Sequence, residues 1–142
     1  IIGGGFPSTT ANMQYVNIAT TGVNFANFGE LIEGLWAVSA ANNAVRGIWA
    51  GGLDPSGVTT IQTMEMASLG NTQKFGDLSA AVAKQGSTTS PTRFITGGGD
   101  SSGATNTISY ITIETQGDSV DFGDLSAARN HVEATSNAHG GL

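Results

Sequence analysis

Two short motifs recur in this sequence at one fixed spacing, and that spacing constrains the fold more than any other feature. The motif Phe-Gly-acid-Leu begins at Phe28, Phe75 and Phe122, which are 47 residues apart. The same interval separates three glycine pairs: Gly4 and Gly5, Gly51 and Gly52, and Gly98 and Gly99. A period of about 20 to 50 residues is typical of repeat proteins. We therefore predict a single repeat domain over residues 1–142, with units at about 1–47, 48–94 and 95–142, in which these glycines and phenylalanines are structural positions.

Each unit contains short segments with the pattern of β-strands. Residues 46–50 and 93–96 are apolar, β-branched or aromatic, and they end at glycines, as buried strands do. Residues 107–115 alternate between apolar and polar side chains over their second half, which is typical of a half-buried strand. The Phe-Gly-acid-Leu segment and a polar segment at 130–137 bring the count to four strands per unit. The sequence thus predicts an all-β fold.

Alanine-rich segments leave a local alternative open. Residues 78–84 and 125–129 could each begin a helix by intrinsic propensity. The 21 glycines and the close spacing of the strand segments argue against a helical-repeat fold, so the alternative is limited to single helical turns.

Composition argues against several classes of function. Eleven acidic residues against five basic ones give a net charge of −6, without a basic run, so binding to a nucleic-acid backbone is unfavourable. No apolar run approaches the roughly 20 residues that a membrane-spanning helix needs, so we expect no membrane insertion. The absence of cysteine excludes disulfides and Cys-ligated metals. Because the first residue is not Met, we expect a processed product or part of a longer protein.

Four short strands in about 50 residues, one of them ending at a glycine pair, resemble the kelch-type blade of a β-propeller. In the third unit, residues 130–139 resemble the innermost strand of such a blade and residues 122–129 the outermost. Kelch repeats carry a Tyr and a Trp after the double glycine. Tyr110 and Phe122 stand near those places in the third unit, whereas Thr63 replaces the Tyr in the second. The resemblance implies a propeller built of four-stranded blades.

The amino-acid sequences of the units also resemble those of a narrower group of proteins. The segments Ile-Ser-Tyr-Ile-Thr-Ile-Glu-Thr at 108–115 and Asp-Phe-Gly-Asp-Leu-Ser-Ala-Ala-Arg at 121–129, with the ending at 136–142, resemble repeats of virion structural and tail-fibre-like proteins of tailed phages, cyanophages among them. This resemblance implies a non-enzymatic structural protein located in the virion. It also implies contacts with other virion proteins or a host-surface glycan, and no cofactor.

Three units raise a question of closure, because propellers have about four to eight blades. The segment 130–139 could lie beside Ile1 and Ile2 and complete a blade, either within one chain or between two copies. Two copies would then give six blades, whereas three units alone could close as a prism-like body. Unpaired sheet edges favour a homo-oligomer in any case.

Three residues are candidates for ligand binding. Trp36 has no counterpart at the equivalent positions of the other units, and Asp54 and Asp100 lie on turns that differ most between units. Loops held on a fixed scaffold often carry function. Trp49, by contrast, lies in an apolar strand and is predicted to be a core residue.

We predict no catalytic residues and no metal site. The segment 99–103 fits the nucleophile motif Gly-x-Ser-x-Gly with Ser101 at its centre, but the helix that this motif requires is not indicated after it, so we interpret it as a turn. His131 and His139 have no third ligand at a metal-binding spacing. The acids that recur once per unit, Glu30, Asp77 and Asp124, are expected to cap turns rather than to hold a cation. The alternative function is a soluble glycan-binding or protein-interaction propeller of non-viral origin, with a hydrolase as a third option.

Overall fold

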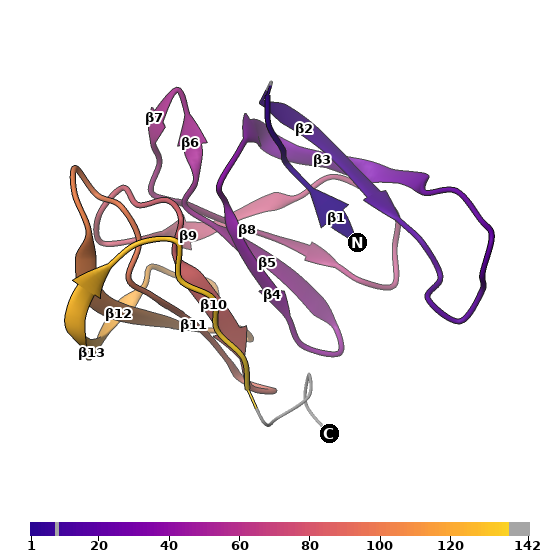
Figure 1. Ribbon diagram of the computed structural model, residues 1–142. Coiled ribbons are helices and arrows are strands. Elements are labelled where there is room, and N and C mark those ends of the chain that lie inside the picture. The colour runs from indigo at the N-terminus through magenta and orange to yellow at the C-terminus, as the bar shows by residue number, and fades with distance from the viewer. Residues whose placement is uncertain (8, 137–142) are drawn as a thin grey trace.

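The computed structural model describes residues 1–7 and 9–136, and within them the chain is all-β, as the sequence predicts (Figure 1). The helical alternative is wrong: residues 125–129 belong to a strand, and residues 78–84 form bends, irregular backbone and an isolated bridge. The described part of the chain contains no helix long and apolar enough to cross a membrane.

The strands form three antiparallel sheets and one small hairpin. The first sheet contains, in spatial order, β1 (Ile2–Gly3), β2 (Thr10–Tyr15) and β3 (Ala26–Leu35). The second contains β4 (Ser39–Asn42), β5 (Arg46–Ala50), β8 (Thr60–Glu65) and β9 (Gln73–Asp77). The third contains β10 (Gly86–Thr89), β11 (Arg93–Gly97), β12 (Thr105–Thr112) and β13 (Val120–Arg129). The hairpin of β6 (Leu53–Asp54) and β7 (Ser56–Gly57) stands apart from the sheets in Figure 1.

Most predicted strands are present, and one is not. The segment 46–50 coincides with β5, 93–96 lies within β11, and the strand expected at 107–115 begins earlier and ends at residue 112. The polar strand expected at 130–137 is wrong: residues 130–136 form no strand, and residue 137 lies outside the described residues. A polar segment gains little from extending unless a neighbouring edge pairs with it, and residues 133–136 are exposed. The second and third sheets have the expected four strands, whereas the first sheet has three.

Backbone features recur at the interval seen in the sequence. Strands β3, β9 and β13 begin at residues 26, 73 and 120, and each of these is 47 after the one before. Ala37, Lys84 and His131 adopt left-handed φ angles of 54°, 57° and 53° at the same interval. Gly51 illustrates the glycine pairs, because its φ is 64° and a Cβ atom there would collide with the carbonyl oxygen of Val82.

The core lies between consecutive sheets, in two clusters. The cluster between the first and second sheets consists of Met13, Phe28, Leu31, Trp49 and Met64, and it confirms Trp49 as a core residue. The cluster between the second and third sheets consists of Ile48, Ala50, Ile61, Phe75, Leu78, Val82, Phe94, Ile111 and Ile113. Phe122 differs from its counterparts Phe28 and Phe75: its exposed fraction is 53%, against 6% and 3%, because none of the sheets formed by the described residues covers it.

Candidate binding cleft

A cleft of about 350 Å³ opens between the β6–β7 hairpin and the turn that follows β11. Its lining residues are Leu53, Ser56, Gly57, Ala81, Ala83, Lys84, Asp100, Ser101 and Ser102. The cleft thus joins loops of the second and third sheets and combines hydroxyl groups with one pair of opposite charges.

Two backbone links hold these loops in place. Trp36 and Leu53 exchange two N–H···O bonds, of 3.2 and 2.9 Å, and Ala83 and Asp100 exchange two more, of 3.1 and 2.7 Å. Residue 83 lies 47 positions after residue 36, and residue 100 lies 47 positions after residue 53. Each link ties the segment after the last strand of one sheet to the loop of the next sheet, so both walls of the cleft are fixed to the scaffold.

The Asp100 carboxylate is the most constrained charged group in the cleft. Its Oδ1 accepts a hydrogen bond from the Gly103 N–H at 2.9 Å, and its Oδ2 lies 3.3 Å from Lys84 Nζ. Both side chains are partly buried. The Gly103 N–H and, after it, the Lys84 ammonium hold the pKa of Asp100 below its usual range. Asp100 is therefore an anionic acceptor at neutral pH, beside a cation and three serine hydroxyls, which suits a small polar or polyhydroxylated ligand.

The structure separates the three residues predicted to bind a ligand. Asp100 lines the cleft, and Asp54 is exposed on the hairpin beside Leu53, which lines the cleft. Trp36 is only partly exposed, and its ring contacts that of Phe6, with centroids 5.5 Å apart. Trp36 therefore belongs to an aromatic pair outside the cleft lining.

Sequence reasoning did not find Lys84. It occupies the position of Ala37 and His131, so no recurring basic residue marks it. It meets Asp100 because the Ala83–Asp100 link brings the two segments together, and that link cannot be read from either segment alone. The β6–β7 hairpin was likewise expected to be a plain turn.

The Ser101 segment forms a turn, as expected. It connects β11 to β12, so a strand and not a helix follows it. Ser102 takes a left-handed φ of 62°, and the Asp100 carboxylate accepts a hydrogen bond from the Gly103 N–H across the turn. The strand-turn-helix geometry of a nucleophile elbow is therefore not formed here.

The acid Asp77 was expected to cap a turn, and the structure gives its carboxylate other partners. Asp77 accepts a hydrogen bond from the Thr59 hydroxyl and pairs with Lys74 at 2.8 Å, so side chains and not backbone N–H groups are the partners of its carboxylate. Within residues 1–7 and 9–136, no three or more His, Cys, Asp or Glu side chains gather closely enough to hold a metal ion. His139 lies outside the described residues.

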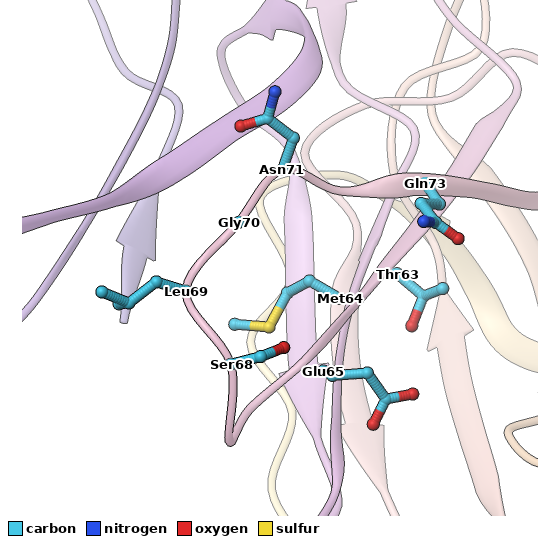
Figure 2. Close-up of a pocket in the computed structure, with 8 residues that line it drawn as sticks. All are labelled: Thr63, Met64, Glu65, Ser68, Leu69, Gly70, Asn71 and Gln73. Carbon is cyan, nitrogen blue, oxygen red and sulfur yellow. The ribbon is translucent and has the colours of Figure 1, made fainter.

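A second cavity, of about 290 Å³, lies beside the loop between β8 and β9 (Figure 2). Its lining residues are Thr63, Met64, Glu65, Ser68, Leu69, Gly70, Asn71 and Gln73. The Glu65 carboxylate is paired with Arg46 at 3.0 Å, and the Gly70 N–H is bonded to the Phe28 carbonyl of the first sheet. This cavity therefore borders a contact between two sheets.

The chain was also compared with known proteins. No model of a known protein family matches it, and no curated protein matches it.

Proposed function

We propose that the protein is a non-enzymatic structural module of a virus particle, of the tail-fibre-like kind, that presents its loops to a host-surface glycan or to another virion protein. The observation that carries this proposal is the cleft between the β6–β7 hairpin and the Asp100 turn. Both of its walls are tied to the sheets by paired backbone hydrogen bonds. Its sequence-variable loops are thus held on a fixed framework, which is the arrangement expected of a display scaffold.

We further infer that the three sheets are kelch-like propeller blades. The features that recur every 47 residues support this inference. The contact between β4 and β10, the first strands of the second and third sheets, supports it as well. The Ser87 hydroxyl donates to the Ala40 carbonyl at 2.9 Å, and the Thr89 hydroxyl donates to the Asn42 carbonyl at 2.7 Å. In a propeller the innermost strands of adjacent blades meet around the central axis in this way.

A soluble glycan-binding propeller of non-viral origin is the second candidate. Phe6, which is 76% exposed, lies against Trp36 and offers an aromatic surface near the loops. Aromatic faces pack well against the apolar faces of sugar rings. This observation supports glycan binding without indicating a virus particle.

Substitutions at the two sites test recognition directly. On a glycan array or against purified virion proteins, we expect Asp100→Asn to weaken binding about tenfold or more. The substitution removes the anionic acceptor and leaves the Lys84 ammonium without its carboxylate partner. Asp54→Asn is the matched control, because Asp54 does not line the cleft. Loss of binding in Phe6→Ala, with Asp100→Asn unaffected, would instead locate recognition at the aromatic pair.

A separate experiment tests whether the protein is a component of virus particles. Mass spectrometry of virus particles purified from the source culture should detect the chain as a stoichiometric component. Its absence from particles, together with retained glycan binding, would favour the non-viral candidate.

A further inference from the structure

Consecutive sheets are joined by a loop of one sheet that docks on the last strand of the sheet before it. In the first joint, the Gly70 N–H donates to the Phe28 carbonyl at 3.0 Å and the Thr72 N–H donates to the Glu30 carbonyl at 2.8 Å. The Asn71 Oδ1 accepts from the Glu30 N–H at 3.0 Å. Figure 2 shows Gly70 and Asn71 where this loop meets β3.

The second joint repeats the first in the same register. The Gly117 N–H donates to the Phe75 carbonyl at 3.1 Å, and the Ser119 N–H donates to the Asp77 carbonyl at 2.9 Å. The Asp118 Oδ1 accepts from the Asp77 N–H at 2.9 Å. Every participant lies 47 residues after its counterpart, so one geometry serves both joints.

A strand glycine makes each joint possible. A Cβ at Gly29 would collide with the carbonyl oxygen of Gly70, and a Cβ at Gly76 with that of Gly117. The corresponding position on the third sheet is Gly123, where a Cβ would meet nothing within 4 Å. The third sheet therefore carries the receiving half of a joint, and no loop among residues 1–7 and 9–136 docks on it.

We call this receiving half, formed by Phe122, Gly123 and Asp124, the tail face. Phe122 meets Tyr110 edge-on, with ring centroids 5.9 Å apart, as Phe28 meets Tyr15 at 6.0 Å. The tail face thus has the same local form as the receiving strand of the first joint. The difference is that Phe122 is 53% exposed, so a large apolar side chain is left uncovered.

The first sheet carries the inserting half of a joint, which also has no partner in the described structure. Residues 23–25 stand where residues 70–72 and 117–119 stand in the other units, and Asn24 lies two residues before β3 as Asn71 lies two before β9. Asn24 is exposed, and Val23 and Phe25 are 49% and 45% exposed. The loop keeps the acceptor side chain that Asn71 and Asp118 provide.

The outer side of the first sheet extends this inserting half. Gly3 and Met13 face the second sheet at Trp49, so their strand neighbours Ile2 and Gln14 point the opposite way. Ile2 is 61% exposed. We call the surface formed by Ile2, Gln14 and residues 23–25 the head face.

We propose that the tail face of one copy of this chain receives the head face of a second copy, in the register of the two internal joints. Asn24 Oδ1 then accepts from the Asp124 N–H, and Phe122 becomes buried as Phe28 and Phe75 are. Two copies that dock reciprocally form a closed ring of six sheets. The ring of six sheets rests on the proposed scaffold function, whereas the joint between copies follows from the contacts of the two internal joints.

The segment after β13 fits the same assembly. Residues 133–136 lie 47 positions after β10, are exposed, and pair with no strand that the structure describes. The edge of β1 that faces away from β2 likewise has no partner strand in the described part of the chain. Docking of head and tail would bring this segment of one copy beside β1 of the other and supply the first sheet with a fourth strand.

Light scattering after size-exclusion chromatography tests the joint. We expect the wild-type chain at twice its mass of 14.4 kDa, and Phe122→Asp and Asn24→Leu each at the single mass. Asn24→Asp should stay dimeric, because the second joint uses an aspartate at this position. Phe6→Asp is the matched control for Phe122→Asp, because it changes an even more exposed phenylalanine that lies on neither face.

Mixing distinguishes head-to-tail docking from a symmetric contact of like faces. Phe122→Asp retains a head face and Asn24→Leu retains a tail face, so an equimolar mixture should form a one-to-one pair at raised concentration, detected by capture of a tagged partner. Circular dichroism checks that each variant is folded. A wild-type monomer at every concentration, or an oligomer that Phe122→Asp leaves intact, would overturn the proposal, whereas loss of glycan binding alone would bear only on the proposed function.

Discussion

At the scale of single residues, Asp100 shows how the candidate cleft depends on contacts between segments distant in the sequence. Its carboxylate is held by the Gly103 N–H within the same turn and by Lys84 from the neighbouring segment. The turn at residues 100–103 could be predicted from its Asp, Ser and Gly content. The ion pair could not, because Lys84 reaches Asp100 only through pairing of the two loops.

The pKa of Asp100 provides the first test. By NMR titration, we expect it to lie below the ordinary value of 3.8, chiefly because of the Gly103 N–H. Lys84→Met should raise this pKa while leaving it below 3.8, because the backbone hydrogen bond remains.

The same shift sets the direction of a stability effect. Because folding lowers the pKa, ionised Asp100 stabilises the folded chain fully above pH 3.8, and this stabilisation is lost as the pH falls through the lowered pKa. The difference in melting temperature between the wild type and Asp100→Asn should therefore shrink below pH 3.8. A constant difference across that range would contradict the assigned contacts.

At the scale of elements, predictions succeeded where a strand is determined by its own side chains. The segment 46–50 is apolar and closes with Gly51, and it forms β5. The segment 130–136 is polar and pairs with no strand among the described residues, whereas the equally polar β10 forms a strand because it pairs with β11. The β6–β7 hairpin was also missed, because Leu53 pairs with Trp36 from the preceding sheet and not only within the turn.

The joints between sheets offer a matched pair of glycine substitutions. Gly76→Ala would push a Cβ against the carbonyl oxygen of Gly117, so we expect a loss of about 1–3 kcal/mol in the free energy of unfolding. Gly117→Ala changes the other side of the same contact, where a Cβ meets nothing within 4 Å, and should alter stability by less than about 0.5 kcal/mol. Urea denaturation measures both, and equal losses would show that the close approach is not what requires glycine.

At the scale of the whole molecule, the sheets contact one another in sequence order, and the two end faces are chemically unlike. The tail face presents an edge strand of the third sheet, and the head face presents a loop with an amide side chain. The all-β class followed from the strand-like segments of the sequence, whereas the two unlike faces became visible only once both internal joints could be compared residue by residue.

Self-association through these faces should make thermal stability depend on concentration. An assembled state that forms only from folded chains is favoured by mass action. A tenfold increase in concentration should raise the melting temperature of the wild type by about 2–4 °C. Phe122→Asp should melt at the same temperature at both concentrations, and a concentration-dependent melt in that variant would place the contact elsewhere.

Each internal joint consists of one receiving strand and one inserting loop, and this has a consequence for how such a chain can lengthen. Duplication of one 47-residue segment would add one half-joint of each kind. The new copy would find its matching surfaces already present on either side, and the two surfaces left at the ends would be the same as before. The number of sheets could therefore change over evolutionary time through duplication or loss of a unit, without a new interface having to arise.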